Sequence, residues 1–179
     1  MEYALEYRYL HKEFSQAIDV KELPEAGVVL HNLSFESKHQ DFLPGTDASY
    51  SLLSDESFSA ADSQINENRN FRYSVFTPPG CSKAGDAIIM LHGLNERDWD
   101  KYLPWAAALT RQTGKPVILF PISFHMNRAP SFWTNPRIMV QVAQIRERMF
   151  KHIKHHSFAN AALSDRLQAN PKRFMLSGI

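Results

Sequence analysis

The chain has 179 residues, 44% of them hydrophobic and 22% charged, a composition typical of a globular protein. Its formal net charge of +1 gives no electrostatic reason to expect binding to nucleic acid or to an anionic membrane. Cys81 is the single cysteine, which excludes an internal disulfide framework. Because the sequence shows neither a signal peptide nor an apolar stretch of about 20 residues, we predict a cytoplasmic protein that does not cross a membrane.

Residues 1–44 are predicted to hold a helix and the first strand. Leu5, Tyr9 and Phe14 recur at a loosely helical spacing, so we expect this helix to pack onto the domain. The apolar and β-branched run from Gly27 to Phe35 is the first strand candidate. Residues 45–70 then contain six serines and five acidic residues, and we predict a mobile excursion or short helices there.

Residues 71–179 are predicted to form the core of an α/β domain. FRYSVF alternates apolar and polar residues, and the TPPG that follows is typical of a turn. Ala87–Leu91 is continuously apolar, which favours a central strand covered on both faces. A helix from Pro104 to Gly114 and a strand from Pro116 to Ile122 complete a βαβ unit, so the two apolar strands are expected to be parallel and neighbouring or near-neighbouring. We therefore predict a mostly parallel sheet flanked by helices.

The apolar run Ala87–Leu91 ends at His92-Gly93 and opens into a polar loop. In an open α/β sheet, ligands bind beyond the carboxyl ends of the strands, where this loop lies. Glycine at position 93 would let the backbone approach a bound group closely. The amides that follow, first that of Leu94, could then point at a substrate oxygen that becomes negative during a reaction.

These residues resemble the first half of an α/β-hydrolase domain. The resemblance covers about Phe71 to Ile122: a strand with a Pro-Pro-Gly turn, a buried strand that ends in LHGL, a helix and a second strand. It implies that the loop after the buried strand supplies one oxyanion-hole amide. Carried over here, Leu94 N–H would be the donor, while His92 and Gly93 would shape the loop.

The sequence departs from this family at the nucleophile. No G-x-S-x-G elbow occurs in the 179 residues, and the last strand-like run, KRFMLSGI, ends at Gly178-Ile179. We therefore expect a domain that is incomplete at its C-terminus, with no hydrolase activity of its own and an unpaired sheet edge that favours self-association. Cys81 and Ser123 are interpreted as structural residues rather than substitute nucleophiles.

A second loop, Ser123–Trp133, is expected to open on the same edge as the first. Its Arg128 has no acidic neighbour in the sequence, which favours a role in gripping an acidic substrate group. Arg97 and Asp98 have a structural alternative, because they could pair locally or cap the following helix. The residues predicted to line a substrate site are Asn95, Arg97, Asp98, His125, Asn127, Arg128 and Trp133.

Residues 133–170 are predicted to be helical, either as a lid over the site or as two packing helices. Asn135-Pro136 gives a cap and a first-turn proline, and apolar residues follow at helical spacing. Within this segment HIKHH holds three histidines, which we interpret as a solvated basic helix end. No metal site and no cofactor are predicted.

Two functional hypotheses result. The first is the N-terminal portion of a serine hydrolase that cleaves carboxyl esters or related acyl compounds, a small-molecule substrate class. The second is a non-catalytic α/β domain that binds a small molecule or a protein partner through the same loops, since the fold alone does not decide between them.

Overall fold

A computed structural model describes residues 2–37, 66–93, 96–123, 125–131, 135–137, 140, 141 and 144. The chain divides into two compact units. The first comprises Met1–Phe35 and Arg72–Pro121, and the second comprises Glu36–Phe71 and Ile122–Ile179.

The predicted N-terminal helix is α1 (Tyr3–Glu13), but its buried side chains are not the expected ones. Leu5 is 51% exposed, whereas Glu6 and Leu10 are buried. The loosely helical spacing therefore indicated the helix without identifying its inner face. The structure places Glu6 there because an arginine from another helix pairs with it, which a sequence pattern of apolar residues does not register.

Two strands and a short 3₁₀ helix follow α1. They are β1 (Val20–Leu23), η1 (Pro24–Ala26) and β2 (Val28–Glu36). The predicted strand at Gly27–Phe35 corresponds to β2, while β1 was missed because it is short and carries Lys21 and Glu22 at its centre. Gly27, which separates η1 from β2, adopts a φ of 63° and so occupies the left-handed region that favours glycine.

The remaining strands of the sheet are β3 (Asn70–Thr77), β4 (Ile88–Met90) and β5 (Val117–Leu119), and the strand order is β1-β2-β3-β5-β4. β1 pairs with β2, and β3 with β5, in the antiparallel sense. β2 and β3 also run in opposite directions, because His31 contacts Thr77 while Ser37 bonds to Arg69.

The prediction of a mostly parallel sheet is therefore wrong: within the described sheet, β4 and β5 alone are parallel. The physical reason is that a continuous apolar run reports burial and not direction. Direction is set by the connections, and the β4–β5 connection contains a crossover helix, as parallel neighbours require.

The βαβ unit is confirmed. β4 and β5 are neighbouring parallel strands, with Ile89 opposite Ile118, and α4 (Leu103–Thr113) connects them. Gly114 ends α4 in the left-handed conformation, with a φ of 67°, and its N–H donates to Thr110 O. Both strands are shorter than predicted. Because they are parallel, their carboxyl ends lie at the same edge of the sheet.

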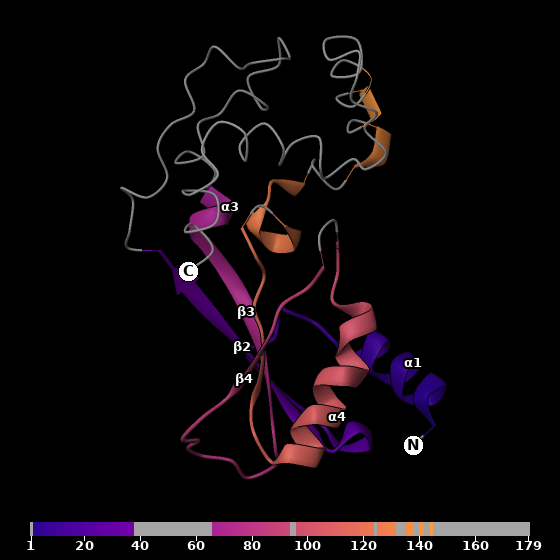
Figure 1. Ribbon diagram of the computed structural model, residues 1–179, viewed down its shortest axis with the longest axis vertical. Coiled ribbons are helices and arrows are strands. Elements are labelled where there is room, and N and C mark those ends of the chain that lie inside the picture. Colours follow the sequence, from indigo (N-terminus) through magenta and orange to yellow (C-terminus); the bar gives the residue numbers. More distant parts are fainter. Residues whose placement is uncertain are drawn as a thin grey trace. The chain divides into compact units, whose positions relative to one another are not determined.

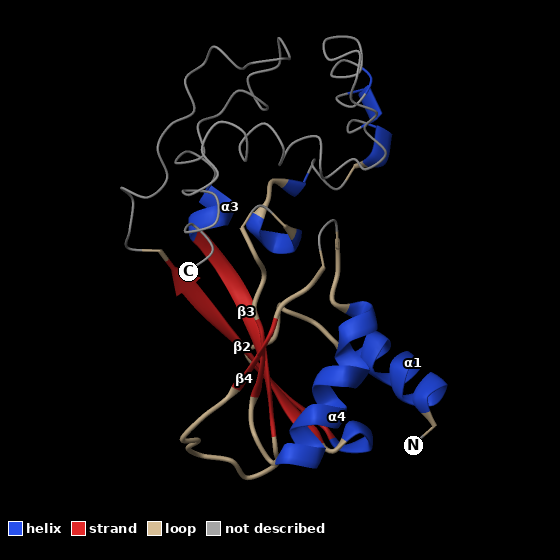
Figure 2. Ribbon diagram, in the orientation of Figure 1, coloured by secondary structure: helices blue, strands red, loops and turns tan. Residues whose placement is uncertain are grey.

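One face of the sheet carries the core of the first unit. Phe76, Val117 and Leu119 are completely buried, and α4 packs on β5 while α1 packs on α4 (Figures 1 and 2). Thr110 of α4 donates a hydrogen bond to the Phe76 carbonyl. Alternation along the strands turns these side chains toward the helices and leaves their neighbours on the opposite face.

The opposite face of the sheet bears on a second prediction, the position of β4. β4 was expected to be a central strand, yet it lies at the end of the described sheet, with Ile89 65% exposed and Leu91 56% exposed. The apolar character of this strand is thus real, but the described residues cover only one of its two faces.

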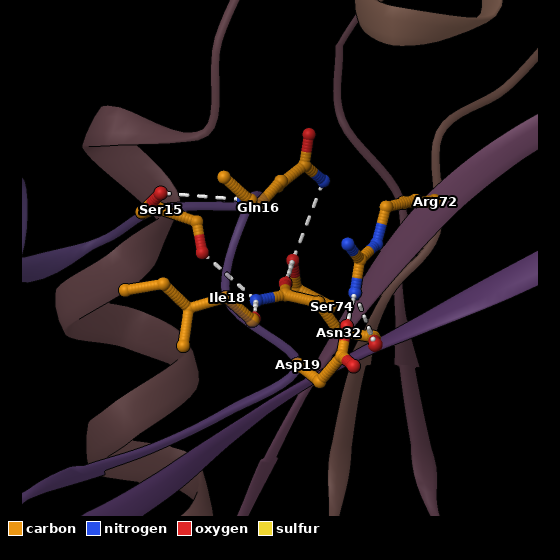
Figure 3. A network of polar contacts seen from close by, with 8 residues as sticks. Ser15, Gln16, Ile18, Asp19, Asn32, Arg72 and Ser74 are labelled. Atoms are coloured by element: carbon orange, nitrogen blue, oxygen red, sulfur yellow. Dashed lines mark hydrogen bonds and ion pairs between the residues drawn. The ribbon is translucent and has the colours of Figure 1, made fainter.

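A buried polar network fixes the segment between α1 and β1 to the sheet (Figure 3). Asn32 of β2 donates through Nδ2 to Ser15 O at 2.8 Å and to Ile18 O at 2.6 Å. Its Oδ1 accepts a hydrogen bond from Ser74 Oγ at 2.6 Å, and Ser74 Oγ in turn lies 3.3 Å from Gln16 Nε2. Every polar atom of the Asn32 side chain is therefore satisfied.

Several predicted features lie outside the described residues. These are the excursion up to residue 65, Trp133 and most of the helical segment 133–170, the HIKHH histidines and the run KRFMLSGI. The described end of the excursion forms a short helix, α3 (Asn66–Arg69). Among the described residues, no helix combines the length and apolar character needed to span a membrane.

Candidate functional site

The loop after β4 has a buried histidine as its second residue. His92 is almost inaccessible, and its ring meets the Trp99 ring edge-on at a centroid distance of 5.4 Å. His92 Nδ1 lies 2.9 Å from Gly93 O. It donates a hydrogen bond there when Nδ1 carries the proton. The predicted role of His92 in shaping the loop agrees with this position.

Gly93 is held through both of its backbone polar groups. Its N–H donates to the Tyr102 hydroxyl at 2.7 Å, and its carbonyl accepts the Glu96 N–H at 3.3 Å. Its φ is outside the left-handed region, and a Cβ added there would meet the Tyr102 hydroxyl at an ordinary 3.4 Å. A side chain at position 93 would therefore not strain the backbone, and the prediction that Gly93 lets the backbone approach a bound group closely is not tested.

Leu94 and Asn95 lie outside the described residues, so the predicted donor amide stays a prediction. Arg97 and Asp98 are both exposed. Asp98 Oδ1 accepts the N–H of Asp100 at 3.2 Å, at the start of η5 (Asp100–Tyr102). This contact supports the structural alternative for Asp98, in which its carboxylate caps the turn that leads into α4.

Sequence reasoning missed the aromatic residues that support this loop. Tyr102 packs edge-on against Trp99 and Trp105, with centroid distances of 5.7 and 5.8 Å. Trp99 is 3% exposed, and its buried indole N–H has no hydrogen-bond partner among the described residues. The three-residue spacing of these aromatics was the available signal, because it places them on one side of a helical turn.

The loop after β5 belongs to the second unit and contains η6 (Met126–Arg128). His125 is buried, with Nδ1 2.9 Å from Ser123 O, and Asn127 is half-buried. Met126 has a φ of 50°, an uncommon conformation for a residue with a side chain. Ser123 is buried as well, which agrees with its interpretation as a structural residue.

Arg128 occupies a buried position rather than an open one. It is 2% exposed, its guanidinium lies 4.3 Å from the centre of the Phe71 ring, and Nη2 donates to Asn68 O at 3.1 Å. Burial lowers the pKa of Arg128 to about 10, so the side chain remains charged at neutral pH. A guanidinium in this position stabilises the second unit through a cation–π contact. Its predicted role in gripping an acidic substrate group stays a prediction.

The two predicted halves of the site lie in different units of the structure. His92, Gly93, Arg97 and Asp98 lie in the first unit, whereas the loop with Arg128 lies in the second. Their juxtaposition therefore stays a prediction. Among the described residues, no three histidine, cysteine or acidic side chains are grouped so that they could hold a metal ion.

Comparison with known proteins assigns the chain to a family. No curated protein and no solved structure is significantly similar to it. The profile of DUF6051, described as a family of unknown function, matches residues 1–179. The chain therefore belongs to the DUF6051 family.

Proposed function

We propose that this chain is the oxyanion-hole portion of a serine hydrolase of the α/β-hydrolase type, acting on carboxyl esters or related acyl compounds. The observation that carries the proposal is the parallel pair β4–β5 with its crossover helix α4, in which His92-Gly93 comes one residue after the end of β4. In the α/β-hydrolase fold, one oxyanion-hole amide comes from the loop between a strand and the first crossover helix.

In this proposal, a serine hydroxyl attacks the acyl carbonyl and a base removes its proton. The carbonyl oxygen becomes an oxyanion, and Leu94 N–H donates a hydrogen bond to it. When the tetrahedral intermediate collapses, the C–O bond to the leaving alcohol breaks and a proton passes to that alcohol. Because the 179 residues hold no G-x-S-x-G, the proposal places the serine and its base outside these residues.

The proposal includes fewer substrate-binding residues than the sequence predicted. Asp98 and Arg128 are left out, because the first caps a turn and the second is buried against Phe71. Arg97 remains, since it is exposed in the loop itself. Asn95, His125, Asn127 and Trp133 stay predictions, as does a cytoplasmic location.

The proposal is tested by labelling with a fluorophosphonate probe. The coding sequence after codon 179 is read, and the longer protein is expressed beside residues 1–179. We expect a single labelled serine in the longer protein and none in the short chain. A specifically labelled serine in residues 1–179 would contradict the assignment, and an unlabelled longer protein would favour the alternative of a non-catalytic binding domain.

A matched pair of substitutions tests the donor amide. Leu94→Pro removes the N–H, whereas Leu94→Ala keeps it and changes only the side chain. Loss of one oxyanion-hole donor reduces kcat by about 100- to 1000-fold. In the longer protein, we expect kcat to fall by this factor in Leu94→Pro and to change by less than a few-fold in Leu94→Ala. Circular dichroism checks that both variants fold. Equal activities in the two variants would remove Leu94 N–H from the mechanism.

A further inference from the structure

The peptide that joins Gly93 to Leu94 is the one whose orientation matters for the proposed site. A trans peptide is planar, so the N–H of the second residue points away from the carbonyl of the first. Whatever fixes Gly93 C=O therefore fixes the direction of the next N–H. Gly93 O accepts the Glu96 N–H at 3.3 Å, and His92 Nδ1 lies 2.9 Å from the same oxygen.

The other side of Gly93 is fixed by a side chain. The Tyr102 hydroxyl accepts the Gly93 N–H at 2.7 Å, a short bond for an amide donor. The Gly93 N–H is therefore hydrogen-bonded within the protein and does not bind a ligand. A glycine has wide conformational freedom, so without such a bond the backbone at position 93 would sample many orientations.

Tyr102 is suited to hold a loop because its own position is firmly determined. The residue is 7% exposed, and its ring lies edge-on between Trp99 and Trp105. Its backbone N–H donates to Trp99 O at 2.8 Å, and α4 begins at the next residue. The hydroxyl therefore projects from a packed aromatic cluster at the start of a helix.

A second connection joins the same two segments. Lys101 forms an ion pair with Glu96, and its Nζ lies 5.0 Å from the centre of the Tyr102 ring. The hydrogen bond to Glu96 raises the pKa of Lys101. About half of the Lys101 side chain is exposed, and exposed ion pairs contribute little, so this connection is the weaker of the two.

We propose that Tyr102 is a positioning residue: its hydroxyl holds the Gly93 N–H and so fixes the backbone on one side of Gly93, while the Glu96 N–H and His92 hold the Gly93 carbonyl, which sets the direction of the Leu94 N–H. What that N–H does rests on the proposed function, whereas the connection between Tyr102 and Gly93 is independent of it. The role belongs to the hydroxyl and not to the ring, since the ring contacts persist when the hydroxyl is removed.

Amide hydrogen exchange measured by NMR on the 179-residue chain tests this connection. Gly93 is itself exposed, so slow exchange of its amide in the wild type must come from the bond to Tyr102. Tyr102→Phe removes that bond, and we expect Gly93 to exchange about 5- to 10-fold faster. Tyr73→Phe is the control, because Tyr73 packs on Phe120 through its ring.

Two results would overturn the inference. One is a Gly93 amide that exchanges in the wild type at the rate of an unprotected peptide, a measurement that needs no variant to fold. The other is a folded Tyr102→Phe protein whose Gly93 exchange is unchanged. Accelerated exchange confined to residues near Gly93, with thermal unfolding matching that of Tyr73→Phe, supports the positioning role.

Turnover separates this inference from the proposed function. In a longer form that hydrolyses p-nitrophenyl esters, we expect Tyr102→Phe to lower kcat by about 10- to 100-fold with KM nearly unchanged, because the donor is misplaced only for the transition state. A wild-type kcat in Tyr102→Phe refutes the positioning role and leaves the hydrolase intact. Faster Gly93 exchange in a protein without any hydrolysis supports the connection and refutes the proposed function.

Discussion

Replacing Asn32 by alanine is expected to destabilise the chain more than any nearby surface change. The Asn32 side chain is buried and makes three hydrogen bonds, two to backbone carbonyls and one from Ser74 (Figure 3). A buried hydrogen bond contributes about 1 kcal/mol, so the loss of three lowers the free energy of unfolding by about 3 kcal/mol. Small domains are stable by only about 5–15 kcal/mol, so this loss is large.

Urea unfolding followed by tryptophan fluorescence measures this change. Leu33→Ala is the matched control, because Leu33 is the next residue of the same strand and is largely exposed. We expect that control to cost about 0.5 kcal/mol or less. A double-mutant cycle with Ser74→Ala should give a coupling energy of about 1 kcal/mol, since the two side chains share one hydrogen bond.

The result that would refute this reasoning is an Asn32→Ala variant no less stable than Leu33→Ala. It would mean that water replaces the lost amide without cost, and that the segment between α1 and β1 is not held by the network. Additive effects of Asn32→Ala and Ser74→Ala would instead remove only the bond between those two side chains.

Three further predictions concern charges and the sheet edge. Arg111→Met leaves the buried Glu6 without its partner, and we expect the free energy of unfolding in urea to fall by about 3 kcal/mol. Glu6→Gln should lower it by less, and equal losses in the two variants would contradict a paired buried charge. The hydrogen bond and charge of Lys21 lower the pKa of Glu13 in the folded chain. The pair therefore stabilises the fold at pH values above the unfolded pKa of about 4.3, and this contribution disappears as the pH falls through the lowered pKa of the folded state. An NMR titration of Glu13 at or above its ordinary pKa would refute this, and Glu13→Gln should lose that part of the acid dependence. Ile89→Lys should reduce self-association through β4 in sedimentation experiments, and a wild-type chain that stays monomeric at high concentration would contradict the expectation.

The sequence by itself determined the elements that have strong local signals. Pro104 at the first turn and Gly114 at the end delimited α4, because each residue suits only one end of a helix. The apolar runs around Ile89 and Ile118 identified two strands, and the helix between them predicted that they are parallel, which is confirmed. Local chemistry also placed His92-Gly93 at the end of a strand.

Only the tertiary structure decided features that depend on distant partners. The antiparallel direction of β1, β2 and β3 follows from how the strands pair, which apolar runs do not encode. Glu6 is buried because Arg111, 105 residues further along the chain, reaches it. Arg128 lies against Phe71 for the same reason, although its sequence neighbours suggested an open site. A side chain's exposure depends on what the fold packs against it, and that information is spread over the whole chain.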